Sequence, residues 1–539
     1  MINNKNSKSA TKMPLLVSIG VAAGILLGAA MTSSDAIQNS YSSVLKFRDV
    51  LSHIERSYVD EIDTEVLVEE AINGMLKKLD PHSVYIPKED LKLAESQLEG
   101  EFEGIGVEFN LLKDTIYVVA PLSGGPSETA GIKAGDKIIT VNGKTIAGTN
   151  LTNRDIFTLL RGPKGSEVEL GIKRRGEDEL INYTVVRDKI PQHSVAVSYM
   201  VNEEVGYIKL TRFSATTYDE FKAAMEELKE QGMEKLILDL QDNPGGYMDR
   251  AINIADEFIS GNKMIVYTDG KRSRYDSQAL AQRKGMFEEQ PVIVLLNEGS
   301  ASASEIVAGA LQDNDRGLIV GRRSFGKGLV QMPIDLNDGS QLRLTISRYY
   351  TPSGRSIQKP YEEGDYRNDL NERYEHGEYF SADSIDFIDT LRYETRNGRV
   401  VYGGGGIMPD FFVPFDTSQS STYLNKLFMN NVINEYTLSY AQDNRKKLEQ
   451  MGFEKYYKSF DVSEQMLQQL TALGKTREVP FDKAGFAQSK ELLRTHVKAL
   501  IARSIWRNKG YYPIYNQTDE VFQEALKLFD EAAELASNE

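Results

Sequence analysis

The sequence contains no cysteine and only five histidines among its 539 residues. The lack of cysteine excludes disulfides, a thiol nucleophile, thiolate metal sites and a lipid-modified cysteine. A formal net charge of −16 argues against nucleic-acid binding, which requires a basic surface. The glycine run at 403–406 lacks the strand–Gly-Lys-Ser/Thr–helix context of a phosphate site and therefore predicts a bend. What remains is an ordinary globular composition, with 40% hydrophobic and 26% charged residues.

The stretch from Pro291 to Gln331 carries the pattern around which the chain is organised. An apolar run at 292–296 predicts a buried strand, and the polar residues at 297–299 end it. Small residues follow, and then apolar residues recur at helical spacing. The pattern predicts a strand, a tight turn and a helix with a serine at the corner. Such a serine has an exposed oxygen beside unpaired backbone N–H groups that can hold an oxyanion.

A serine nucleophile needs a base, and none of the five histidines lies between residues 291 and 331. That segment does contain Lys327, between two glycines and near apolar residues. Burial disfavours the charged ammonium, so a lysine in this place is a candidate to accept the serine proton. Gln331 follows Lys327 by four residues and is a candidate to orient the amine.

The segments GSASASEIVAGALQD and FGKGLVQ together resemble the carboxyl-terminal processing peptidases, also called tail-specific proteases. The resemblance runs over residues 41–415. It implies that Ser302, the second serine of S-A-S-A-S, is the nucleophile, that Lys327 is the base and that Gln331 orients it. The sequence spacing from Ser302 to Lys327 and that from Lys327 to Gln331 both match those of the family. No metal and no cofactor are implied.

The resemblance also implies an oxyanion hole and a fold. In the family an Asn-Pro-Gly-Gly turn supplies one N–H group, so the expected pair is the amide of Gly245 or Gly246 together with that of Ala303. The family usually has arginine where this chain has Gln241, which leaves the packing beside the turn open. The expected fold is α/β and multidomain, with helical N- and C-terminal regions, a PDZ domain and a crotonase/ClpP-like protease core.

Residues 100–188 resemble a PDZ domain, beginning with a glycine turn that runs into a strand. Successive N–H groups in such a turn can bind a chain-terminal carboxylate while the strand edge pairs with the ligand. The expected binding loop is Gly104, Ile105, Gly106 and Val107. The expected partners are therefore proteins or peptides with free, unstructured carboxyl ends. A small β-rich domain without a ligand is the alternative.

Three lysines precede an uncharged stretch at 13–31, which would span roughly 28 Å as a helix. The positive charges predict a cytoplasmic tail at 1–12, a membrane anchor at 13–31 and a catalytic part in the periplasm. The expected location is thus a bacterial inner membrane with a single pass. The small residues at 28–30 leave a cleaved signal peptide, and secretion to the periplasm, as the alternative.

The remaining segments are assigned by periodicity. Residues 41–98 are expected to be helical, with His82 as a turn residue bonded to the backbone after Asp-Pro. Residues 194–415 form the expected protease domain, in which the acidic, tyrosine-rich segment 361–384 is a surface insertion. Residues 418–539 are expected to be helical, with apolar faces that need cover from the protease domain or from a second subunit. A homo-oligomer is therefore possible.

The sequence predicts an exported serine endopeptidase that recognises the carboxyl end of a protein through its PDZ domain and cleaves it with a Ser/Lys dyad. Two alternatives belong to other classes: a non-catalytic PDZ scaffold, and a small-acyl hydrolase or isomerase on a related fold. The complete Ser/Lys/Gln set argues against the first, and the PDZ domain together with the lack of a nucleotide-binding motif argues against the second.

Overall fold

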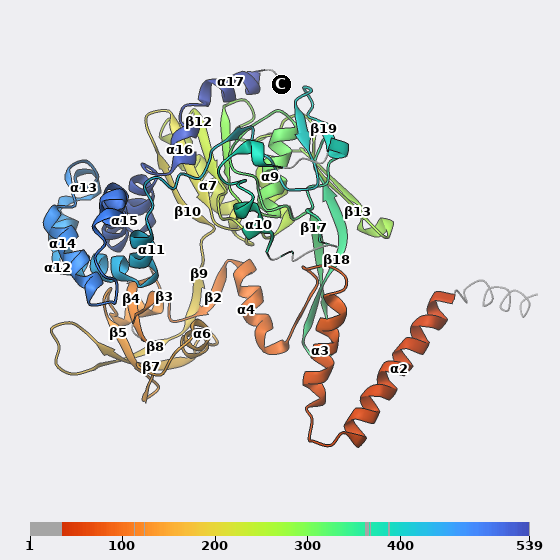
Figure 1. Cartoon of the computed structure of the whole chain (residues 1–539), viewed down its shortest axis with the longest axis horizontal. Helices are drawn as coiled ribbons and strands as arrows, with labels where there is room; N and C mark the ends of the chain where they lie inside the picture. The colour runs from red at the N-terminus through yellow and green to blue at the C-terminus, as the bar shows by residue number, and fades with distance from the viewer. Residues whose placement is uncertain are drawn as a thin grey trace, which may run out of the picture. The chain divides into compact units, whose positions relative to one another are not determined.

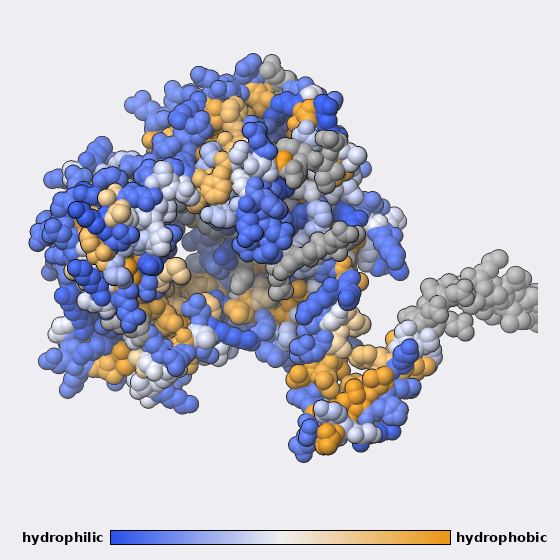
Figure 2. All heavy atoms as spheres, viewed as in Figure 1, coloured by the Kyte–Doolittle hydropathy of each residue, from blue (hydrophilic) through white to orange (hydrophobic). Residues whose placement is uncertain are grey.

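The computed structural model describes residues 35–112, 114–122, 124–361, 366, 368–385 and 389–537. The chain divides into two compact units, Met1–Leu79 and Asp80–Glu539. The first unit contains two helices, α2 (Asp35–Ser57) and α3 (Thr64–Leu76) (Figure 1). Figure 2 shows apolar side chains exposed along them. The exposed set is Tyr41, Val44, Phe47, Val50, Val66, Leu67 and Met75.

The second unit is built around a six-stranded sheet with the order β10-β11-β12-β15-β16-β21. Only the β10–β11 pair is antiparallel; the remaining pairs are parallel. The central strands are continuous apolar runs because both of their faces are covered. The strands are β10 (Val195–Met200), β11 (Val205–Leu210), β12 (Lys235–Asp239), β15 (Val292–Leu296), β16 (Leu318–Gly321) and β21 (Phe411–Phe412).

Helices cover this sheet from both sides. The crossover helices α7 (Thr217–Glu230), α8 (Met248–Ala255) and α9 (Ala303–Asp313) share one hydrophobic core with one face. The last two helices, α16 (Glu520–Ala525) and α17 (Phe529–Ser537), share a second core with the other face. The end of the chain therefore forms a layer of the protease core.

A second sheet, with the order β1-β18-β13-β14, carries the lysine segment. Strand β17 joins it as the partner of β18 in an antiparallel hairpin, and β17 begins just after Lys327. Two short strands, β19 (Arg392–Glu394) and β20 (Val400–Tyr402), pair separately. The strands of the second sheet are β1 (Val84–Ile86), β13 (Met264–Gly270), β14 (Ser277–Leu280), β17 (Leu329–Asp335) and β18 (Gln341–Tyr350).

Residues 105–186 fold around their own core as a six-stranded antiparallel sheet with two helices. Its edge strand β3 has only β4 as a partner among the described strands. Strands β2 (Glu101–Gly104) and β9 (Asp188–Pro191) pair at the boundary of this part, and α4 (Lys88–Glu99) precedes it. Its elements are β3 (Val107–Leu112), β4 (Thr115–Pro121), α5 (Pro126–Ala130), β5 (Lys137–Val141), β6 (Lys144–Thr145), α6 (Asn153–Leu160), β7 (Glu167–Lys173) and β8 (Ile181–Val186).

The C-terminal region is helical, as predicted, and has a core of its own. The long helical segment α15 is interrupted at Arg507, whose φ is 56° and ψ −144°. The predicted region 418–539 thus contains two parts, since its apolar stripe at 521–532 packs on the core sheet and not on the bundle. The bundle helices are α11 (Thr422–Met429), α12 (Val432–Met451), α13 (Phe453–Ser459), α14 (Glu464–Lys475) and α15 (Lys483–Tyr515).

Candidate active site

Ser302 lies at the corner that the sequence predicts, between the end of β15 and the first residue of α9. Its backbone has φ 57° and ψ −111°, a conformation that residues with a side chain rarely adopt. Such strain persists only where surrounding structure enforces it, and it often marks a functional site. The turn places Ser302 at a strand-to-helix elbow.

Glu305, in the first turn of α9, binds the backbone of Ser302, and the sequence analysis missed it. Its fully buried carboxylate accepts two hydrogen bonds through Oε2, from the N–H of Ser302 (2.7 Å) and of Lys327 (2.9 Å). Oε1 accepts two more, from Gly326 N (2.7 Å) and Ser324 Oγ (2.5 Å). The sequence signal that could have identified Glu305 is the helix-capping pattern, in which an acid follows a serine by three residues at the start of a helix.

The same carboxylate therefore joins the serine elbow to the lysine loop. Its environment acts in two directions, since burial raises the pKa of Glu305 and its four hydrogen bonds lower it. Burial is the larger effect, and the resulting pKa is about 7. Two segments that are far apart in the sequence meet at this one buried group.

Lys327 lies in a largely desolvated place. Burial lowers its pKa below the usual value, against the opposing charges of Glu305 and Asp80, and the charge of Arg343 lowers it further. In the described part of the chain, no hydrogen bond links Ser302 Oγ with Lys327 Nζ. The amide nitrogen of Gln331 donates to Thr345 Oγ1 (3.2 Å) and not to the lysine.

The Asp80–Ser83 segment also belongs to this neighbourhood. Asp80 accepts from the N–H of His82 (2.8 Å), which gives the predicted turn, and from Thr345 Oγ1 (3.1 Å), the partner of Gln331. The ring of His82, however, hydrogen-bonds the hydroxyl of Tyr366 (2.8 Å). Burial, followed by the charge of Lys327, lowers the pKa of His82 to about 4, so this histidine is neutral at physiological pH.

The glycine turn lies directly against the serine. A Cβ atom on Gly245 would stand 2.7 Å from Ser302 Cβ and 2.8 Å from Ala303 N, so only glycine fits. Of the expected oxyanion donors, Gly245 N already donates to Asn243 Oδ1 (2.9 Å). The amides of Gly246 and Ala303 have no acceptor among the described residues, which makes them the better-placed pair.

The other two serines of the motif connect the two turns. Ser300 Oγ donates to Leu240 O (2.8 Å), and Ser304 Oγ donates to Asn243 O (2.9 Å). Both serines are fully buried. Their hydroxyls hold the glycine turn and the serine elbow in register, which is a structural task distinct from nucleophilic attack.

A lysine from the neighbouring strand β11 lies beside Gln241, the residue whose packing the sequence left open. Lys209 Nζ donates to Asp239 Oδ1 (2.9 Å) and to the carbonyl of Gln241 (2.7 Å). The Gln241 side chain donates to Asp519, which precedes α16 (3.3 Å). The turn is thus supported from both sides, although the expected arginine is absent.

The predicted carboxylate loop, Gly104 to Val107, lies between β2 and the edge strand β3. Its carbonyls are occupied, since Gly106 O accepts from Leu122 N and Ile105 O accepts from Ser127 N (both 2.9 Å). Gly106 has φ +71°, which favours glycine. Phe157 of α6 meets Phe109 of β3 with ring centroids 6.1 Å apart, so an apolar helix face lies beside the free edge.

The segment predicted as a surface insertion, 361–384, contacts the lysine loop through a buried arginine. Arg373 lies in α10 (Asp369–Glu375) and is only 4% exposed. Its guanidinium donates to the carbonyls of Ser324 (3.0 Å) and Arg323 (2.8 Å). Its charge is balanced by Glu378, which also pairs with Arg323. This part of the insertion supports the loop from outside.

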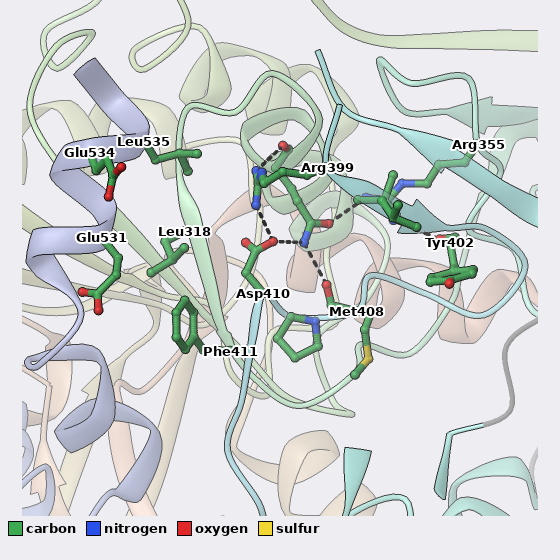
Figure 3. Close-up of a pocket in the computed structure, with 14 residues that line it drawn as sticks. Leu318, Arg355, Arg399, Tyr402, Met408, Asp410, Phe411, Glu531, Glu534 and Leu535 are labelled. Atoms are coloured by element: carbon green, nitrogen blue, oxygen red, sulfur yellow. Dashed lines mark hydrogen bonds and ion pairs between the residues drawn. The ribbon is translucent and has the colours of Figure 1, made fainter. Parts of the chain in front are cut away.

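A cavity of about 550 Å³ lies elsewhere, at the β16–β21 edge of the sheet beside α17 (Figure 3). Arg399 pairs there with Asp410 and Asp315, and Arg355 pairs with Asp313 at the far end of α9 from Ser302. In the described residues no three His, Asp or Glu side chains gather in a way that would hold a metal ion.

The predicted location needs correction. Within the residues that the structure describes, no helix is long and apolar enough to cross a membrane. This finding contradicts the predicted single-pass protein of a bacterial inner membrane and gives no support to contact with a membrane through an N-terminal helix. The predicted anchor itself, residues 13–31, lies outside the described residues.

Four family models match parts of this chain. The family model for peptidase family S41 matches residues 204–367, and a PDZ domain model matches residues 104–185. A model for the N-terminal domain of the activating protease CtpB matches residues 27–90. Residues 423–507, within the helical bundle, match a family of unknown function.

Curated relatives extend the similarity across most of the chain. A carboxy-terminal-processing protease of Bartonella bacilliformis is 40% identical over 342 residues, which are 63% of this chain and 78% of the relative. The carboxy-terminal processing protease CtpB of Bacillus subtilis is 36% identical over 350 residues, 64% of this chain and 70% of the relative. Among solved structures, the photosystem II D1 C-terminal processing protease is 27% identical and covers 69% of this chain and 92% of its own, with a TM-score of 0.36.

These relatives and the fold define a serine peptidase with a PDZ domain. The chain belongs to the carboxyl-terminal processing proteases of peptidase family S41, as the sequence predicts. Its architecture, with helical terminal regions, a PDZ domain and an S41 protease core, is confirmed. The alternatives of a non-catalytic scaffold and of a small-acyl hydrolase are set aside, because the family consists of serine peptidases.

Proposed function

We propose that this protease is an endopeptidase in which Ser302 attacks the scissile carbonyl and Lys327 accepts the serine proton. The observation that carries the proposal is the shared carboxylate oxygen of Glu305, which accepts from the backbone N–H of both residues. Because one atom anchors both, the serine elbow and the lysine loop are held at one place. The strained backbone of Ser302 supports the same assignment.

In the proposed reaction, one proton moves between the side chains of Ser302 and Lys327. As Ser302 Oγ bonds to the carbonyl carbon, its proton passes to the neutral amine of Lys327, a form that the lowered pKa of this lysine favours. The oxyanion receives hydrogen bonds from the amides of Ala303 and Gly246. The lysine then gives its proton to the leaving amine. In the second half of the reaction it accepts a proton from the water that attacks the acyl group, and it returns that proton to Ser302 Oγ as the acid product leaves.

Gln331 keeps its proposed role of orienting Lys327. Its amide nitrogen is held by Thr345, which leaves its carbonyl oxygen as the atom to accept from the lysine amine. The contact between Ser302 Oγ and Lys327 Nζ is expected to form when substrate is bound, because catalytic hydrogen bonds are often long in the free enzyme.

Substitution tests the dyad directly. Ser302→Ala and Lys327→Ala should each abolish cleavage of an unfolded protein substrate, while their circular dichroism spectra stay native. Ser459→Ala and Lys426→Ala are matched controls, because both residues are exposed on the helical bundle. Full activity of Ser302→Ala would remove the proposed nucleophile, and full activity of Lys327→Ala would remove the base.

The proposed substrate is a protein with a free, unstructured carboxyl end. PDZ domains commonly add a peptide as a strand at a sheet edge, and β3 offers such an edge beside α6. The N–H groups of the loop from Gly104 to Val107 would receive the terminal carboxylate.

A further inference from the structure

Tyr349, near the end of β18, contacts both halves of the proposed dyad through one atom. Its single hydroxyl proton is shared between two acceptors, the carbonyl of Lys327 at the shorter distance (2.5 Å) and the carbonyl of Ser302 at the longer one (3.1 Å). The backbone carbonyls of the base and of the nucleophile are thus bridged by a single buried group. This contact is independent of the Glu305 carboxylate, which holds the N–H groups of the same two residues.

The position of this hydroxyl is fixed from several directions. The Tyr349 side chain is 1% exposed and belongs to the core that also contains Ala303 and Ile306 of the nucleophile helix. Its backbone N–H donates to Gly328 O (3.0 Å), next to the lysine. The strand itself is paired with β13 at this point, Thr268 opposite Tyr349. A rigid strand therefore carries the hydroxyl to the lysine loop.

The two bridged carbonyls depend on this hydroxyl to different degrees. Ser302 O also accepts from the N–H groups of Glu305 (2.9 Å) and Ile306 (3.0 Å), so it stays satisfied without Tyr349. Lys327 O has no other donor within the described residues. Loss of the hydroxyl should therefore loosen the lysine loop more than the serine elbow.

We infer that Tyr349 is a positioning residue of this protease, whose hydroxyl sets the placement of Lys327 relative to Ser302. The inference rests on the proposed dyad. The charged and titratable groups that face Lys327 are Glu305, Asp80, Arg343 and His82. Tyr349 changes none of these charges, because burial raises its pKa well above the usual value and it stays protonated wherever the enzyme works.

Tyr349→Phe is the test, since it removes one oxygen and keeps the buried ring. Activity is expressed per folded molecule. We expect kcat to fall by about ten- to a hundredfold with KM within about twofold, because small displacements of reacting groups cost about that much. We also expect the acidic limb of the pH–rate profile to move to higher pH. A looser loop admits water, which raises the pKa of the lysine towards its ordinary value.

Tyr350→Phe is the matched control, because its ring stacks on Tyr267 on the other side of the strand and should leave both readouts unchanged. A fall in stability alone would reduce the folded fraction without moving the pH profile. If Tyr349→Phe matches Tyr350→Phe in kcat and pH profile while Ser302→Ala is inactive, this inference is wrong and the dyad stands. If Ser302→Ala is active, the dyad itself fails.

Discussion

Replacement of Glu305 by glutamine should lower both activity and stability, because the two oxygens of its carboxylate accept four hydrogen bonds. A glutamine side chain offers one acceptor oxygen, so two donors keep a partner and the other two face an NH₂ group. Each unpaired buried donor costs about 1–3 kcal/mol, which gives a loss of about 2–6 kcal/mol in the free energy of unfolding. The serine elbow and the lysine loop also separate, so kcat should fall at least about tenfold.

The same variant has a pH signature. Burial raises the pKa of Glu305 to about 7 from the ordinary 4.5, so the folded state holds a proton that the unfolded chain releases. For a carboxyl with a raised pKa, the stabilising contribution is complete below about 4.5 and is lost as pH rises through about 7. The shift corresponds to roughly 3 kcal/mol. Glu305→Gln should lack this part of the pH dependence.

Urea unfolding at pH 5 and pH 8, together with peptide cleavage at both values, measures these effects. Glu289→Gln serves as the control, because Glu289 is exposed on a loop. An equal pH dependence in Glu305→Gln and the wild type would refute the assigned burial effect. Activity within twofold of the wild type would refute the role of the carboxylate in holding the two segments together.

Three further outcomes are expected. Ser300→Ala and Ser304→Ala should keep the nucleophile but lose one register hydrogen bond each, so kcat should fall by about two- to tenfold and not be abolished; complete loss in Ser300→Ala alone would question Ser302 as the nucleophile. Amidation of a substrate's carboxyl end should lower kcat/KM about ten- to a hundredfold with little change in kcat, since the loop at Gly104–Val107 would lose a charged acceptor; equal cleavage of both substrates at all concentrations would reject carboxylate capture. Phe522→Ala should lower the free energy of unfolding by about 3–5 kcal/mol in urea titrations, because this buried ring lies in the core under the sheet; a loss below about 1 kcal/mol would show that α16 is not a layer of the core.

Much of the site could be predicted because its information is local in sequence. The apolar run of β15, the small-residue turn and the spaced apolar residues of α9 lie within one continuous segment, and they place Ser302 at the elbow. The glycine turn is local in the same way, since φ values of +94° at Gly245 and +145° at Gly246 require glycine in the turn itself. Periodicity likewise predicted helices in the C-terminal region.

Only the tertiary structure decided which distant groups meet around that elbow. Glu305 looks like a helix-capping acid in the sequence, yet three of its four donors come from the loop of Ser324, Gly326 and Lys327. The sequence shows Tyr349 only as a strand residue, whereas in the fold its hydroxyl lies within hydrogen-bond distance of the carbonyls of Ser302 and Lys327. An amphipathic stripe, such as that of α16, shows that a face must be buried but not which surface covers it. The partner of a buried group depends on how separate layers pack. The spacing of residues along the chain does not encode the distance in space between groups on different layers.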